Sequence, residues 1–188
     1  MPSELSNAQS TVARIQTILR TKLDDEIDAI NAGDPWDASG IVLPYVATDA
    51  ITQWDFPAII QGYPVGILVT MSSEQYTHRA GSNEVDVVGE YTFAIFVRDA
   101  LLGSASGDRH LLGAAVYAYS WAAATCVVRN LRADSKAAGE NVDRCSYVSN
   151  SVDPSVYDDK QGRSQILRYA DSVVRVKRRT IEPFPVTP

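Results

Sequence analysis

Apolar residues near the start of the chain recur every three or four positions, which is the spacing of an amphipathic α-helix. Ser6 and Gln9 have the capping-box pattern of a helix N-terminus, and Gly33 before Asp34 and Pro35 is a typical helix stop. The sequence therefore predicts a helix from Ser6 to about Gly33. Its buried stripe comprises Val12, Ile15, Leu19, Leu23, Ile27 and Ile30.

A second helix is predicted over Arg109–Arg132, and it has no polar face. One side carries larger apolar residues, and another carries a narrow stripe of small residues, namely Ala114, Ala118, Ala122 and Cys126. A helix that is apolar all round is covered on more than one side. The sheet and the first helix can supply two covers, and a neighbouring subunit is a third. Ala114, Ala118 and Ala122 are therefore candidate interface residues, unless the helix is wholly buried in its own chain.

The same helix contains eighteen consecutive uncharged residues, Leu111–Val128, which is long enough to span a membrane. Six of them are Ala, and Ser120, Thr125 and two Tyr make the segment more polar. We therefore expect a buried helix of a soluble protein. The first residues of the chain have no basic segment followed by an apolar one, so no signal peptide is predicted.

Strands are predicted between and after the helices. Val65–Met71 and Glu84–Asp99 have strand-like patterns, and Ser72–Asn83 between them is expected to be a hairpin arm. Cys145–Val152 and Ser164–Ile181 are expected to form a closing antiparallel pair. This order predicts an α+β fold, in which an N-terminal helix and a long buried helix pack on an antiparallel β-sheet.

Two stretches contain many prolines. Trp36–Pro64 predicts brief strands at Ile41–Leu43, Ala50–Thr52 and Ile59–Ile60. Because proline cannot donate a hydrogen bond to a sheet, these segments are expected at sheet edges or in loops. Residues 1–181 are expected to form one domain. The tail, residues 182–188, reads Glu-Pro-Phe-Pro-Val-Thr-Pro and is expected to be extended.

The composition argues against several kinds of site. The 188 residues include two Cys (Cys126 and Cys145) and two His (His78 and His110), too few for a disulfide framework or a His-rich metal centre. The sequence has no phosphate-binding glycine-rich motif and no nucleophile elbow. We therefore expect no enzyme activity, no cofactor and no bound metal.

Charge is distributed unevenly along the chain, whose net charge is −6. Residues 1–99 hold 14 acidic and 5 basic residues, whereas residues 100–188 hold 9 acidic and 12 basic ones. Asp24 and Asp25 belong to an acidic group on the first helix. An acidic half and a basic half can pair between neighbouring subunits, as a head-to-tail ring requires.

Basic residues gather on the last predicted strand. Arg175, Lys177 and Arg179 share one face of that strand, because side chains alternate between the faces of a sheet. Three interpretations are open. The residues can protect an edge strand from aggregation, contact phosphate, or pair with the acidic half of the protein. Together with Asp24 and Asp25 they are candidate interface residues.

In the order of these elements and in their residue composition, the chain resembles the tail terminator (tail completion, head–tail joining) proteins of tailed bacteriophages. The resemblance rests on the capped first helix, the strand ending in Glu90–Asp99, the Ala- and Tyr-rich helix Arg109–Arg132, and the final hairpin ending in Val173–Arg178. It covers most of the chain from Ser6 to Phe184.

The resemblance implies a structural protein of the virion, made in the host cytoplasm, rather than an enzyme. Such proteins form hexameric rings that close the tail tube and join it to the neck, and DNA passes through the ring without sequence recognition. The implied partners are further copies of the chain, the tail tube protein and the connector proteins. Ser72–Asn83 and Asp153–Arg163 would reach those partners. A nucleic-acid-binding module that uses the basic strand is the alternative function.

Overall fold

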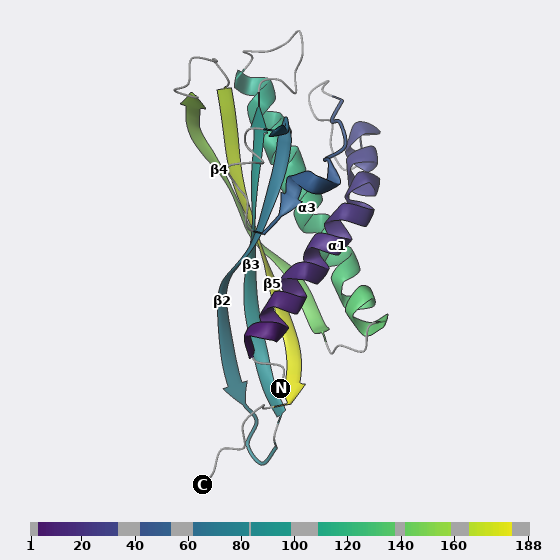
Figure 1. The fold of residues 1–188 in the computed structure, drawn as a ribbon, viewed down its shortest axis with the longest axis vertical. Coiled ribbons are helices and arrows are strands. Elements are labelled where there is room, and N and C mark those ends of the chain that lie inside the picture. The colour runs from purple at the N-terminus through teal and green to yellow at the C-terminus, as the bar shows by residue number, and fades with distance from the viewer. Residues whose placement is uncertain are drawn as a thin grey trace.

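The computed structural model describes residues 4–33, 42–53, 62–82, 84–98, 109–137, 142–158 and 166–181. In these residues, helices α1 (Glu4–Asn31) and α3 (Arg109–Ala137) accompany a five-stranded sheet. Figure 1 shows both helices on the same side of the sheet, where they cross each other. The predicted α+β class is confirmed.

The first helix has the predicted buried stripe. Val12, Ile15, Leu19, Leu23, Ile27 and Ile30 are all buried, and Ile18 joins them. The helix begins at Glu4, so Ser6 lies inside it and the predicted capping box does not mark its start. The predicted stop is confirmed: Gly33 has a φ of +86°, and its N–H donates to the carbonyl of Ile30 at 2.9 Å.

The second helix is longer than its sequence pattern predicts. It ends at Ala137 rather than at Arg132, so the polar residues after Arg132 form a further helical turn. Contacts with α1 accompany this extension: Arg14 forms an ion pair with Asp134 at 3.1 Å, and Lys22 donates to Asn130 at 3.1 Å. These polar contacts come from residues far apart in the sequence.

The strand order in the sheet is β1-β2-β3-β5-β4. The strands are β1 (Ile51–Thr52), β2 (Val65–His78), β3 (Glu84–Arg98), β4 (Val142–Asp158) and β5 (Ile166–Ile181). All neighbours are antiparallel except the short β1, which pairs parallel to β2. Of the brief early strands, Ile51–Thr52 is confirmed and Leu43 is not in a strand. Ile41 and Ile59–Ile60 lie outside the described residues.

The predicted hairpin arm exists and is mainly β-structure. Strand β2 continues through Ser72 to His78 and pairs with β3 as far as Val85. Gly81, with a φ of +75°, lies in the turn that follows. Figure 1 shows the arm extending away from the helices at the lower end of the molecule. The final hairpin is also longer than predicted, because β4 continues to Asp158.

Residues 42–50 pack beside the C-terminal end of α1. The side chain of Asn31 accepts a hydrogen bond from the N–H of Leu43 at 2.8 Å and donates to the carbonyl of Leu43 at 2.9 Å. Tyr119 on α3 donates to the carbonyl of Pro44 at 2.7 Å. A 3₁₀ turn, Thr48–Ala50, then leads into β1. This segment therefore joins both helices to the sheet.

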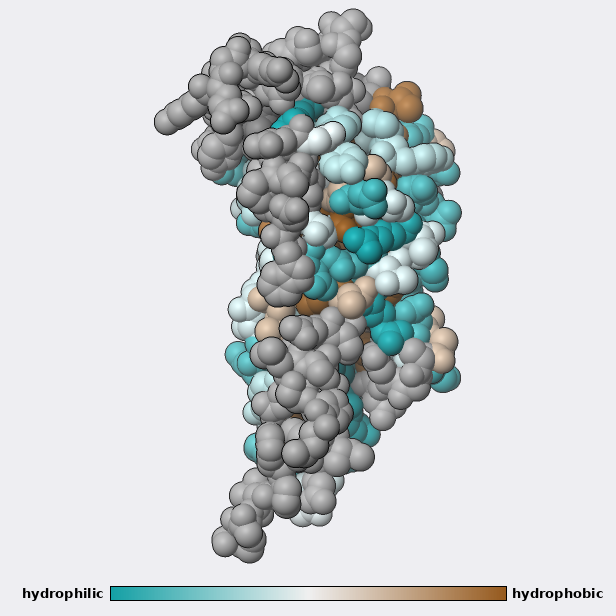
Figure 2. Space-filling model, viewed as in Figure 1, coloured by the Kyte–Doolittle hydropathy of each residue, from teal (hydrophilic) through white to brown (hydrophobic). Residues whose placement is uncertain are grey.

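One hydrophobic cluster runs through the described elements, from Val12 on α1 to Val176 on β5. This continuous core is what the predicted single domain requires. The tail, residues 182–188, lies outside the described residues. On the face of the molecule that Figure 2 shows, the described residues are largely hydrophilic and apolar residues appear in small patches.

Among the described residues, one stretch is long and apolar enough to cross a membrane, Leu111–Ala137 in α3. Of its apolar eighteen-residue window, 61% is buried inside the structure. Buried helices of folded domains commonly have this composition.

Candidate functional site

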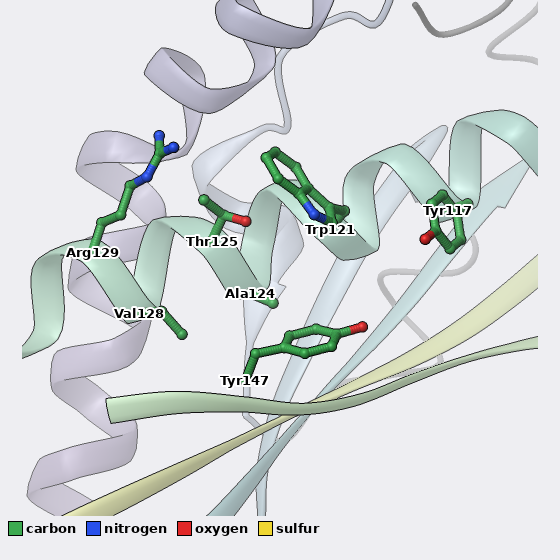
Figure 3. A pocket seen from close by; sticks show the side chains of 7 residues that line it. All are labelled: Tyr117, Trp121, Ala124, Thr125, Val128, Arg129 and Tyr147. Carbon is green, nitrogen blue, oxygen red and sulfur yellow. The ribbon is translucent and has the colours of Figure 1, made fainter. Parts of the chain in front are cut away.

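A groove of about 350 Å³ lies between α3 and β4. Figure 3 shows Tyr147 rising from β4 toward α3, where Ala124 and Val128 face it; Trp121 projects from another side of the helix. The complete lining consists of Tyr117, Trp121, Ala124, Thr125, Val128, Arg129 and Tyr147. The groove is thus made of three aromatic residues around small and aliphatic ones.

Large apolar side chains are exposed at this groove. Tyr117 is 44% exposed and Tyr147 is 47% exposed, and Val148 beside the groove is 39% exposed. Exposed aromatic side chains gathered around a concave surface are typical of protein–protein interfaces. The groove also lies at the end of the sheet, since no strand in the described part of the chain pairs with the outer edge of β4.

A β-bulge in β4 shapes this edge. Tyr147 pairs with Val174 and Ser149 pairs with Val173, so Val148 is the extra residue in β4. Before the bulge, odd-numbered residues such as Tyr147 face α3. After it, Asn150 faces α3, where the Ser120 hydroxyl donates to its side-chain oxygen at 2.7 Å. Bulges twist an edge strand and disfavour uncontrolled pairing with other sheets. The groove, rather than the strand edge alone, is therefore the candidate contact surface.

The sequence interpretation missed these residues. One usable signal was the spacing on the predicted second helix: Tyr117, Ala124 and Val128 recur at intervals of seven and four, which places them on one helix face. No local pattern reveals Tyr147, because the bulge and the partner strand decide which way it faces.

The predicted basic residues lie together on one face of β5. The two valines beside them, Val174 and Val176, are buried on the opposite face, as predicted. The prediction of an edge strand was wrong: β5 lies between β3 and β4 and pairs with both.

Each of these basic side chains has an acidic partner in its own chain. Arg175 contacts Glu90 at 2.6 Å, Lys177 contacts Asp86 at 3.5 Å, and Arg179 lies 3.8 Å from Glu84 and from Asp86. We call this set, with the three acids on β3, the charge ladder. The acidic and basic halves of the chain therefore pair here within one molecule.

The alanine stripe lies mostly inside the chain. Ala118 and Ala122 have no exposed surface, and Ala114 is half-buried. The prediction that this stripe contacts a neighbouring subunit was wrong for Ala118 and Ala122, because the chain's own core already covers them. The alternative of a helix side buried in its own chain holds for these two residues.

The acidic candidates lie on the exposed side of α1. Asp24 and Asp25 are both exposed, and partial burial together with Asp28 and Asp25 raises the pKa of Asp24. The neighbouring Asp28 accepts a hydrogen bond from the hydroxyl of Tyr45 at 2.7 Å. The structure does not bring this acidic group to the basic residues of β5, which pair with acids on β3 instead.

The surroundings of the two thiols disfavour their thiolate forms. Cys126 lies in the core of α3 as predicted, and burial raises its pKa to about 12. Cys145 is half-buried on β4, and burial likewise raises its pKa to about 12. A thiolate, not a thiol, is the nucleophile, so neither residue is activated. Within the described ranges, no three His, Cys, Asp or Glu side chains are grouped as metal ligands would be.

No protein-family model matches this chain, and no curated protein matches it at a significant level.

Proposed function

We propose that this chain is a structural protein of a bacteriophage neck, which assembles into a ring that terminates the tail tube. The proposal joins the resemblance to tail terminator proteins with a surface suited to contacts between chains. In this role the protein acts by assembly rather than by catalysis. Its partners are further copies of itself, the tube and the connector, and viral DNA passes through the ring.

The observation that carries the proposal is the exposed aromatic groove beside the outer edge of β4, which no strand in the described residues covers. Tyr117 and Tyr147 leave nearly half of their surface exposed on opposite walls, one on a helix and one on a strand. Aromatic residues are enriched at the centres of protein interfaces, where they supply large contact areas at a low cost in conformational entropy. A second protein chain covering this groove would bury that surface.

The architecture also supports the proposal. The chain has the small α+β form that the resemblance implies, with a first helix, a sheet, a buried helix and a closing hairpin. The arm formed by β2 and β3 extends beyond the helices and offers a place for contacts with the tube or the connector (Figure 1).

The alternative, a nucleic-acid-binding module, draws less support from the geometry. Duplex DNA is bound chiefly through cationic side chains that neutralise phosphates. In this chain Arg175, Lys177 and Arg179 already have carboxylates within 4 Å, so DNA would have to compete with the charge ladder. If this alternative held, the protein would bind duplex DNA at low salt, and Arg175→Gln would lower the salt dependence of binding.

The ring is tested on the purified protein by mass photometry and negative-stain microscopy. We expect a ring of several copies with a central hole. Tyr117→Ser and Tyr147→Ser should shift the population toward monomers, because they remove exposed aromatic contacts. Tyr76→Ser is the matched control, since Tyr76 has 42% exposure but lies on β2, which β3 and β5 separate from β4 in the strand order. A monomer at every concentration would contradict the proposal.

A further inference from the structure

We propose that the groove between α3 and β4 binds the proline-rich segment 182–188 of a neighbouring copy of this chain. The inference rests on the proposed self-assembly and names the segment that would fill the groove. Each subunit would then give its tail to the next, which links the copies in one direction.

The groove has the chemistry of a site for an extended proline-rich segment. Such segments dock between aromatic rings, which pack against the flat faces of proline. Here Tyr117 on α3 and Tyr147 on β4 supply rings, Ala124 leaves space between helix and strand, and Trp121 contributes a third ring from another side of the helix (Figure 3).

The polar atoms of the groove complement those of the segment. A proline residue has a carbonyl acceptor but no N–H donor. The indole of Trp121 and the guanidinium of Arg129 carry N–H donors. Arg129 is the one charged residue among those described as lining the groove; its Nη1 already pairs with Glu26 at 2.8 Å, and 61% of its side chain stays exposed, which leaves its other N–H groups for a second acid. Arg129 and Glu182, the one charged residue of the segment, complement each other because their charges are opposite.

The sequence of the segment favours binding in an extended form. Three of its seven residues are proline, and Phe184 stands between two of them. Proline restricts the backbone before binding, so less conformational entropy is lost when the segment is ordered. Phe184 supplies an apolar anchor of the kind that aromatic grooves accept.

Chain geometry favours a groove on another molecule. Tyr147 in the groove pairs with Val174 on β5, and β5 ends at Ile181, seven residues further along. Seven strand residues span roughly 23 Å. Phe184 lies three residues beyond Ile181 and can reach at most about 11 Å from it. The Cα of Phe184 therefore stays roughly 12 Å short of the Val174–Tyr147 pair of its own chain, whereas the segment of another copy has no such limit.

Site-specific photocrosslinking of the full chain tests this inference. Phe184 is replaced by p-benzoylphenylalanine (Phe184→p-benzoylphenylalanine), and ¹⁴N-labelled and ¹⁵N-labelled proteins are mixed, illuminated and analysed by mass spectrometry. We expect mixed-isotope crosslinks between position 184 and residues 117–128 or 145–148. Crosslinks within one molecule, crosslinks to other elements, or no crosslinks would overturn the inference.

A binding measurement with a peptide gives an independent test. A fluorescent peptide with the sequence of residues 182–188 is titrated with the full-length protein, and its anisotropy is recorded. We expect saturable binding that Tyr147→Ala weakens about tenfold, the size of effect typical of a lost aromatic contact. Tyr76→Ala, the matched control, should leave binding unchanged. Absent binding, or equal binding by both variants, would overturn the inference.

The two proposals fail in distinguishable ways. Rings that form without crosslinks from position 184 would overturn the tail inference and leave the ring standing. A monomer at every concentration would contradict the ring and, with it, the binding of a neighbouring copy's tail.

Discussion

Arg178 on β5 and Glu74 on β2 form an ion pair across the intervening strand β3. Their Nη2 and Oε1 atoms lie 2.7 Å apart, and the side chains are 12% and 6% exposed. Gly89 makes this possible because it pairs with Glu74 in the β2–β3 register and has no side chain to separate the charges. The ring of Tyr91 lies over Gly89, and its hydroxyl donates to Glu74 at 3.3 Å.

We predict that Glu74→Gln strongly destabilises the protein. The substitution leaves the guanidinium of Arg178 buried without its counter-charge, and breaking one side of a buried ion pair costs about 3–5 kcal/mol. Urea denaturation measures the change. Glu90→Gln is the control, because its partner Arg175 is 51% exposed and such pairs contribute at most about 1 kcal/mol. Equal effects of the two substitutions would contradict the prediction.

We predict that Gly89→Ala destabilises the protein through a clash with Tyr91. A Cβ at position 89 would lie 2.9 Å from Cε2 of that ring, so the ring would have to move from its place beside Glu74. Overpacking of this kind costs about 1–3 kcal/mol. In a Tyr91→Leu background the cost should largely disappear, which a double-mutant cycle detects.

Gly113→Ala should have the opposite effect. A Cβ at position 113 meets no atom within 4 Å, and Gly113 lies in helix α3. Alanine in a helix is more favourable than glycine by roughly 0.5–1 kcal/mol, so the midpoint of thermal unfolding should rise. A lower midpoint would contradict the prediction, because it would show that the protein does not tolerate a methyl group at position 113.

We predict that the protein loses stability in alkaline solution. Burial raises the pKa of Tyr91, of Cys126 and of Cys145 to about 12 each. Above about pH 9 the unfolded chain therefore releases protons that the folded chain retains, and the free energy of unfolding falls as the pH rises toward 12. Urea denaturation at several pH values measures the slope. The double variant Cys126→Ala/Cys145→Ala should show a shallower decline.

We predict that Ser120→Ala loosens β4. Its hydroxyl donates to Asn150 at 2.7 Å, and this bond joins α3 to the edge strand that forms one wall of the groove. A buried hydrogen bond contributes about 1 kcal/mol, so amide hydrogen exchange around Asn150 should become roughly fivefold faster while β3 is unchanged. Ser149→Ala, on an exposed side chain of the same strand, is the control.

Local patterns predicted much of the fold and little of the candidate site. The stripe from Val12 to Ile30 and the alternation along Glu84–Asp99 are properties of neighbouring residues, so they could be recognised without the structure. The end of α3 could not, because contacts such as Arg14 with Asp134 involve residues 120 positions apart. In the groove, the residues that α3 contributes recur at helical spacings in the sequence, whereas no sequence pattern indicates Tyr147 on β4.

The amino-acid sequence by itself determined two helices, a mainly antiparallel sheet and a basic face on the last strand. These features depend on the period of apolar residues, which is set by the geometry of each element alone. Tertiary structure alone decided that β5 lies inside the sheet, that Arg175 and Lys177 pair with acids on β3, and that a bulge directs Tyr147 toward α3. The reason is physical: strand order and register depend on long-range packing, which no local period encodes.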